Sequence, residues 1–359
     1  TGKLLETQKD VYVRVARVLA HADAQYDLSQ KQVLDNFVTN YTLMARKLFM
    51  PNSPTLMNGG YPNGQLSACF VLPVGDSIAE ILDAVKKTGV IHKSGGGTGF
   101  NFGRIRPADY FVSTTYGKAS GPLSFIGIFN EVTRAVNQGG FRRGANMGIL
   151  PVHHPNIMEF IDSKTNLTSF QNFNFSVGVT DEFIKAYQED REYELIDPTN
   201  SRPVMRLKAR EVFDKIVKNA HMYGEPGIIL LDRINRGNPT PKLGKIEATN
   251  PCGEQPLLSN EACNLGSINL VEFVDRKVKK FDYKRLEEVT ELATRFLDNV
   301  IDANCFPFQD IADIVGKTRK IGLGVMGFAD TAALLGHAYD SPEAVALAER
   351  IMSTVQNLS

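Results

Sequence analysis

Two runs of apolar residues near the start of the chain recur every three or four positions, which is the spacing of one helix face. They are Val11, Val15, Val18 and Leu19 in the first run and Val33, Phe37 and Tyr41 in the second. His21 falls near the end of the first predicted helix, where a polar side chain is expected. We therefore predict a helical N-terminal domain over residues 1–50.

Short apolar runs alternate with helical periods after a stretch rich in helix breakers, residues 50–64. The run 66–72 predicts a buried strand that carries Cys69. Asp76 and Ser77 then cap a predicted helix, which we expect to end at Gly89. Its inward positions are expected to be Ile78, Ile81, Leu82 and Val85.

The same alternation continues along the chain and indicates a parallel sheet or barrel. The further predicted strands are Phe173–Val179, Ile228–Leu231 and Cys263–Leu270. The further predicted helices are one over 212–220, stopped at Gly224, one with Val289, Leu292, Phe296 and Val300 facing the core, and one that begins near Pro342. The glycine-rich stretch 321–330 is expected to form part of the barrel wall. We predict an α/β fold, with residues 51–359 in one domain built on a parallel sheet or barrel.

The composition excludes some classes of protein. The chain of 359 residues has 40 basic and 40 acidic side chains, so no net charge draws it to nucleic acid polymers or to anionic membranes. It has neither a run of about 18 apolar residues nor a signal peptide, which favours a cytoplasmic protein. Because it begins at Thr1 without methionine and ends at Ser359 within a helical pattern, we expect it to be a fragment.

The four cysteines, Cys69, Cys252, Cys263 and Cys305, are too scattered for a disulfide scaffold. They also lack the CxxC pairs of a structural zinc site, and we expect no metal site. Cys305 is expected to be a buried thiol. The adjacent His153 and His154 point apart on regular structure, so we assign them no catalytic role.

The run 250–257, NPCGEQPL, places an amide, a thiol and a carboxyl group on alternate residues. In an extended loop Asn250, Cys252 and Glu254 would point the same way and could face one bound molecule. That arrangement suits a sulfur-centred reaction with a carboxylate as acid or base. The alternative is a surface turn whose cysteine has no function, and the spacing alone favours neither.

Two glycine-rich stretches also allow more than one interpretation. HKSGGGTGFNFGRIRP, residues 92–107, matches neither common phosphate-loop pattern and is either a tight turn at a barrel rim or a nucleotide contact. QGGFRRGANMG, residues 138–148, places two arginines between glycines. Such a loop suits phosphates or a planar base, and the alternative is a solvated arginine pair.

NPCGEQPL followed by CNLGSINL resembles the radical-cysteine loop and the next barrel strand of ribonucleotide reductase large chains. The similarity is greatest to the adenosylcobalamin-dependent class II enzymes. SPTLMNGG, QLSACFVLPVGDS, HKSGGGTGFNFGRIRP and QGGFRRGANMGIL agree in the same order, from about Ser53 to Asp330. The resemblance implies the first half of a ten-stranded α/β barrel with its finger loop, behind a helical N-terminal domain. The second half would follow Ser359.

The resemblance also implies catalytic roles. Cys252 would become a thiyl radical that removes the hydrogen from C3' of the ribose, Glu254 would take the 3'-hydroxyl proton, and Asn250 would bind the hydroxyls. Cys69 and Cys263 would supply two electrons by closing to a disulfide, which a thioredoxin-type or glutaredoxin-type dithiol would then reduce. Adenosylcobalamin is the implied cofactor, and the product would serve DNA synthesis.

The implied binding residues form two groups. A ribonucleoside di- or triphosphate would contact Ser53, Ala68 and Gly97, with Gln138 and Arg142 sensing its base. A deoxynucleotide effector would contact Asp76, Ser77, Ile78, Arg106 and the loop from Ser113 to Lys118. Because such an effector site usually lies at a subunit interface in the family, we expect a homodimer.

Three alternatives remain open at this point. The chain could be a class I large subunit that needs a separate metal-containing radical subunit. It could be a nucleotide-binding regulatory module without catalysis, although Cys69, Cys252, Glu254 and Cys263 together argue against that. A plain thiol-disulfide oxidoreductase is disfavoured by the lack of CxxC.

Overall fold

The computed structural model describes residues 5–62, 64–112, 116–136 and 143–359. The chain divides into two compact units, residues 1–68 with 263–359 (the first unit) and residues 69–262 (the second unit). The sequence-based boundary at residue 50 stays a prediction. Gln138, Arg142 and Ser113 lie outside the described residues.

The first unit begins with the two predicted helices, α1 (Gln8–Asp23) and α2 (Gln30–Ala45). Each opens with a capping box, Thr7 with Asp10 and Ser29 with Gln32, which satisfies amide groups that a helix start leaves unpaired. The breaker-rich stretch contains two short elements that the pattern did not predict, β1 (Phe49–Pro51) and α3 (Ser53–Asn58). Pro54 is compatible with α3 because it lies in the first helical turn.

The rest of the first unit surrounds strand β13 (Glu261–Asn269), which confirms the strand predicted near Cys263. Strand β1 pairs with it antiparallel and β16 (Ile321–Met326) pairs with it parallel, so the glycine-rich stretch is a strand. The remaining elements are η1 (Leu270–Phe273), β14 (Val274–Asp275), β15 (Lys280–Phe281), α10 (Tyr283–Ala303), α11 (Gln309–Thr318), α12 (Phe328–Leu335) and α13 (Pro342–Leu358).

One apolar core holds the first unit together, with contributions from α1, α2, α10 and α13. Phe49 and Phe296 meet edge to face with ring centroids 5.1 Å apart, and neither ring is exposed. Leu292 was predicted to face this core but is 39% exposed, because its position on α10 turns outward. Cys305 was predicted to be buried and is exposed, because it follows the end of α10.

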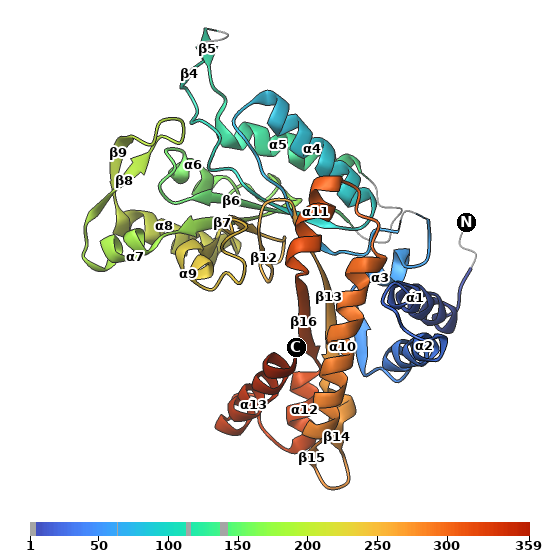
Figure 1. Ribbon diagram of the computed structural model, residues 1–359. Coiled ribbons are helices and arrows are strands. Elements are labelled where there is room, and N and C mark those ends of the chain that lie inside the picture. The colour runs from blue at the N-terminus through green and yellow to red at the C-terminus, as the bar shows by residue number, and fades with distance from the viewer. Residues whose placement is uncertain (1–4, 63, 113–115, 137–142) are drawn as a thin grey trace. The chain divides into compact units, whose positions relative to one another are not determined.

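The second unit is built on parallel strands in the order β2 (Cys69–Val71), β3 (Gly97–Asn101), β6 (Asn146–Pro151), β7 (Phe173–Val179) and β10 (Gly227–Leu230). Figure 1 shows the helices that connect these strands, with α4 and α5 side by side. The connecting helices are α4 (Ile78–Lys93), α5 (Gly121–Ala135), α6 (Ile157–Asp162), α7 (Asp181–Gln188), α8 (Ala209–Tyr223) and α9 (Leu231–Arg236). The alternation confirms the predicted α/β class.

Antiparallel hairpins complete the second unit. They pair β4 (Phe111–Val112) with β5 (Gly117–Lys118), β8 (Glu192–Ile196) with β9 (Pro203–Lys208), and β11 (Ala248–Thr249) with β12 (Pro256–Leu257). The last hairpin carries the NPCGEQPL run at its tip.

Two expectations for α4 were wrong. The helix does not end at Gly89 but continues to Lys93, and the left-handed residue beyond it is Gly95. A Cβ on Gly89 would lie 3.5 Å from Val132 of α5, so this glycine lies at the contact between two helices rather than at a helix end. Ile78 and Leu82 were predicted to face inward, but their side chains are 59% and 49% exposed. Fewer of the apolar residues of α4 face the core than the apolar pattern predicts.

Strand β3 lies within the stretch 92–107, for which a turn at a barrel rim was one of two interpretations. The stretch contains a buried strand. Thr98 on this strand joins a buried chain of hydrogen bonds, accepting from or donating to His92 Nε2 at 2.9 Å and donating to Asn146 Oδ1 at 2.7 Å. The glycines on either side of Thr98 face the other way, toward the β11–β12 hairpin.

Candidate active site

The register of the parallel strands brings the site residues of the second unit to one face. Cys69 on β2 lies beside Gly97 on β3, and Val71 lies beside Gly99. Side chains alternate between faces along a strand, so Cys69, Gly97 and Gly99 share one face and Thr98 points to the other. Cys69 is only 2% exposed.

The run 250–255 is a closed turn between β11 and β12. Gly253 N donates to Asn250 O at 3.1 Å and Asn250 N donates to Gln255 O at 3.2 Å. Gly253 has φ +87°, a backbone conformation that glycine adopts without strain. The loop is therefore a closed turn rather than the extended segment on which the expected alternation was based. Asn250 is buried, whereas Cys252 and Glu254 are exposed.

Glycines of β3 allow this hairpin to lie directly on the strand. A Cβ on Gly99 would be 1.7 Å from Thr249 O, and a Cβ on Gly97 would be 2.8 Å from Pro251 Cγ. No side chain fits at either position without a backbone shift. The glycine-rich stretch thus positions the cysteine-bearing turn, a role that its composition alone does not reveal.

Two members of the turn converge on the Cys69 thiol. The Asn250 amide donates to Cys69 Sγ at 3.2 Å, and the Cys69 thiol lies 4.0 Å from Glu254 Oε1, toward which it donates. Asn250 is itself fixed, because its Oδ1 accepts from Gln255 N at 2.9 Å. The structure therefore brings together Cys69, Asn250 and Glu254, and places Cys252 on the same turn.

The first unit carries the other predicted residues near Cys263. Cys263 lies on β13, is 1% exposed, and donates from Sγ to Asn264 O at 3.1 Å. Its carbonyl accepts from Ala68 N at 3.1 Å, so Ala68 and Cys263 are backbone neighbours. Ser53 is exposed at the start of α3.

The predicted effector residues at the start of α4 and in the loop after β3 include one ion pair, Asp76 with Arg106. Asp76 accepts from Arg106 N at 2.7 Å and from Arg106 Nε at 2.8 Å, and this hydrogen-bonded carboxylate raises the pKa of the guanidinium. Ser77 caps α4, and Ile78 begins the helix with its side chain exposed. Lys118 lies on the β4–β5 hairpin, where its ammonium pairs with Asp109 at 3.2 Å.

Of the two adjacent histidines, His154 has contacts that serve the fold. His154 is 1% exposed, its Nδ1 accepts from Asn156 N at 3.0 Å, and its Nε2 lies 2.9 Å from Ile105 O. Burial lowers the pKa of His154 to about 4, so the ring is neutral near pH 7. Within the described residues no group of three or more His, Cys, Asp or Glu side chains could hold a metal ion.

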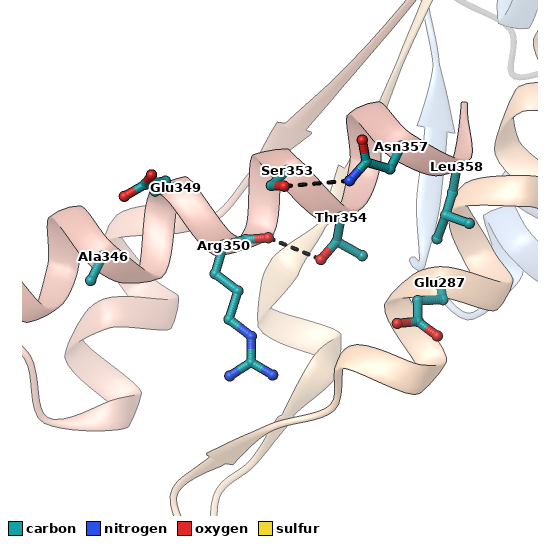
Figure 2. A pocket seen from close by; sticks show the side chains of 8 residues that line it. All are labelled: Glu287, Ala346, Glu349, Arg350, Ser353, Thr354, Asn357 and Leu358. Carbon is teal, nitrogen blue, oxygen red and sulfur yellow. Dashed lines mark hydrogen bonds between the residues drawn. The ribbon is translucent and has the colours of Figure 1, made fainter.

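A groove of about 590 Å³ between α10 and α13 contains none of the predicted site residues. Figure 2 shows its polar side chains, and two of them bond within α13 itself, Thr354 to Arg350 O and Asn357 to Ser353. Arg350 stacks on the Tyr283 ring at 3.8 Å from its centroid. The groove therefore lacks a convergent set of polar groups and is not the candidate site.

The chain matches two family models. Residues 1–64 match the all-alpha domain of ribonucleotide reductase, and residues 67–359 match its barrel domain. The chain belongs to the ribonucleotide reductase large-chain family. This confirms the resemblance of the sequence and the expected combination of an all-α domain with a barrel domain.

Relatives of this ribonucleotide reductase chain fall into two groups by name. It is 55% identical to a vitamin B12-dependent ribonucleoside-diphosphate reductase of Thermoplasma acidophilum, over 87% of this chain and 40% of that protein. It is 46% identical to a protein of the same name from Mycobacterium tuberculosis, over 99% of this chain and 51% of that protein. It is 31% identical to a ribonucleoside-diphosphate reductase large subunit of Plasmodium falciparum, over 99% of this chain and 47% of that protein. The chain thus spans about half the length of its relatives or less.

Sequence reasoning missed the residues that hold the β11–β12 hairpin on the sheet. Asn101 Nδ2 donates to Glu247 O at 3.0 Å, and Arg104 pairs with the Glu247 carboxylate. Asn174 Nδ2 on β7 donates to Pro251 O at 2.8 Å. Their only sequence signal is an amide side chain in or at the end of an otherwise apolar strand.

No described helix is both long and apolar enough to cross a membrane.

Proposed function

We propose that the protein carrying this chain reduces ribonucleotides to 2'-deoxyribonucleotides by thiyl-radical chemistry at Cys252. The observation that carries the proposal is the convergence of Asn250 and Glu254 on the Cys69 thiol, with Cys252 exposed between them on the same turn. Acid, amide donor and thiol are the groups that the reaction requires. The names of the relatives support the same chemistry.

The steps balance as follows. The Cys252 thiyl radical forms an S–H bond with the hydrogen from C3', and Glu254 accepts the proton of the 3'-hydroxyl. The 2'-hydroxyl leaves as water with a proton from the thiol pair. Cys69 and Cys263 give two electrons and close to a disulfide, and the electrons form a new C2'–H bond with their second proton. Cys252 then returns its hydrogen to C3', and Glu254 returns the proton to the 3'-oxygen. A thioredoxin-type or glutaredoxin-type dithiol then reduces the disulfide.

The Glu254 carboxylate faces the Cys69 thiol, which lies 4.0 Å from Oε1 and donates toward it. A carboxylate that has taken the 3'-hydroxyl proton can hold it and return it to the 3'-oxygen at the end of the reaction. Asn250 is neutral at every pH and offers both donor and acceptor atoms, so it can bind ribose hydroxyls without competing for the proton.

Adenosylcobalamin is the cofactor that we propose. The exposed Cys252 fits it, because a thiol at the tip of a turn can meet a bulky group from outside the strands. When bound, the cofactor supplies the radical equivalent that oxidises the Cys252 thiol. Identities of 46% and 55% to vitamin B12-dependent relatives, against 31% to a large subunit, favour this class over the alternative with a separate radical subunit.

The remaining site roles and partners belong to the same proposal. The substrate is a ribonucleoside di- or triphosphate that contacts Ser53, Ala68 and Gly97, with its base sensed by Gln138 and Arg142. A deoxynucleotide effector binds around the Asp76–Arg106 pair, where Asp76 holds the Arg106 guanidinium near the start of helix α4. A helix start and a cationic side chain both favour the binding of phosphate groups. A homodimer and a cytoplasmic location complete the proposal.

The test is deoxyribonucleotide formation by the complete protein that carries this chain, with a dithiol, with and without adenosylcobalamin. We expect activity that needs the cofactor and disappears in Cys252→Ala. Cys305→Ala is the matched control, because both thiols are exposed, and it should stay active. Activity only with an added radical subunit would assign the chain to class I. Deoxynucleotide binding without turnover would favour the regulatory module.

A further inference from the structure

Asn174 occupies an unusual place on strand β7. Its neighbours Phe173 and Phe175 are 1% and 2% exposed and point into the aromatic core on the helix-covered face. Asn174 alternates to the opposite face. It pairs in register with Met147 on β6, which pairs with Gly99 on β3. Asn174 thus belongs to the face on which the β11–β12 hairpin lies.

The Asn174 side chain reaches the cysteine-bearing turn directly. Its Nδ2 donates to Pro251 O at 2.8 Å, a normal distance for a well-formed hydrogen bond. This carbonyl belongs to the peptide group that joins Pro251 to Cys252. Because that peptide is planar, fixing its oxygen also fixes the direction of the Cys252 N–H and the position of the Cys252 Cα.

Other contacts hold the same turn from different sides. Gly97 and Gly99 set how closely it approaches β3, and Asn250 closes it internally through Gln255. Asn174 donates from strand β7 to the backbone next to Cys252, whereas Asn101 and Arg104 hold the hairpin farther from the tip, at Glu247. The Asn174 contact therefore helps to hold the hairpin on the sheet and also acts at its tip.

We propose that Asn174 is a positioning residue, whose amide orients the Pro251–Cys252 peptide and so aims the Cys252 thiol at the reacting carbon. Its effect on turnover rests on the proposed function. Its effect on the turn does not, and the two can be measured separately.

The decisive variant is Asn174→Asp, which keeps the size of the side chain but replaces the donor with an acceptor that repels the carbonyl. Asn174→Ala removes the contact without repulsion. Gln171→Ala is the matched control, since Gln171 is an exposed amide three residues earlier that bonds to Leu167 O and not to the turn.

Turnover is measured on the complete protein with adenosylcobalamin and a dithiol. We expect kcat of both Asn174 variants to fall about tenfold to a hundredfold, which is what small misplacements of reacting groups cost. KM should stay within about twofold, because substrate contacts are unchanged and only the approach to the transition state is affected. Gln171→Ala should match the wild type.

Amide hydrogen exchange of residues 250–255 provides the second readout. Loss of one hydrogen bond should raise exchange in this segment about fivefold to tenfold. Residues 261–269 of β13 should be unaffected. A uniform rise over the whole chain with a lower melting temperature, or variants that behave like Gln171→Ala in both assays, would overturn the proposal. If the wild type makes no deoxyribonucleotide, the proposed function fails, and a localised rise in exchange would still support the positioning contact.

Discussion

Substitution of Gly99 by alanine is expected to displace the cysteine-bearing hairpin. The added Cβ would lie 1.7 Å from Thr249 O and 2.8 Å from Thr249 C. Ordinary contacts between such atoms are about 3.5 Å, so β11 must move away from β3 by about 1.5 Å or more. Neither partner is a flexible side chain, because both atoms of Thr249 are backbone. The shift therefore passes to the turn that carries Cys252.

Two magnitudes follow from this displacement. Overpacking of this kind costs about 1 to 3 kcal/mol of stability, and a misplacement of about 1 Å in a reacting group costs about a hundredfold in rate. We expect Gly99→Ala to lose at least that factor in kcat and to unfold at a temperature a few degrees lower. Activity should fall far more than stability alone explains.

The assays are deoxyribonucleotide formation and thermal unfolding of the complete protein. Gly316→Ala is the matched control, because it lies in helix α11 with nothing within 4 Å of the added Cβ. There the change should stabilise the helix by up to about 1 kcal/mol and leave turnover unchanged. Wild-type turnover in Gly99→Ala would refute the reasoning, because turnover would then not depend on the close approach of the β11–β12 hairpin to β3.

Three further outcomes can be checked independently. Burial lowers the pKa of His92 and His154 to about 4 in the folded protein, so below about pH 6.5 the unfolded chain binds more protons than the folded chain. The free energy of unfolding should therefore fall from pH 6.5 toward pH 4, by up to about 3 kcal/mol for each ring. Urea unfolding at a series of pH values should show this fall, and a free energy of unfolding that does not change with pH would contradict the prediction. Asp76→Asn should weaken deoxynucleotide binding several-fold in calorimetry, because Arg106 loses the carboxylate that orients it, while stability changes by less than about 1 kcal/mol. Phe296→Ala empties a fully buried site and should cost about 3 to 5 kcal/mol in urea unfolding, and a loss below 1 kcal/mol would contradict the described core.

Elements with a strong local signal were predictable from the sequence. Strand β7 has the predicted bounds, Phe173–Val179, because its apolar run is bounded by turn residues. Helix α8 ends at the expected Gly224, which has φ +80°, a conformation that favours glycine at a helix end. Thr180 caps α7, its side chain accepting from Phe183 N, as threonine commonly does directly before a helix. In each case residues close in sequence determine the structure.

Features set by tertiary contacts were not predictable. Gly89 has the composition of a helix stop but lies where α4 packs against α5. The glycines around Thr98 suggested a turn, whereas they clear space for a hairpin that lies about 150 residues later in the chain. Asn250 and Glu254 converge on Cys69 through a closed turn rather than through the extended alternation of a strand. The role of Asn174 was not predictable either, because its hydrogen-bond partner, the Pro251 carbonyl, is distant in sequence.

A single turnover without external reductant tests the proposed radical chemistry most directly. The complete, fully reduced protein is mixed with ribonucleotide and adenosylcobalamin, and the deoxyribonucleotide and the disulfide are measured together by mass spectrometry. We predict at most one product per chain and a new disulfide between Cys69 and Cys263, absent in Cys252→Ala. Product formed without that disulfide, or equally by Cys252→Ala, would contradict the assignment of the radical and of the electron source.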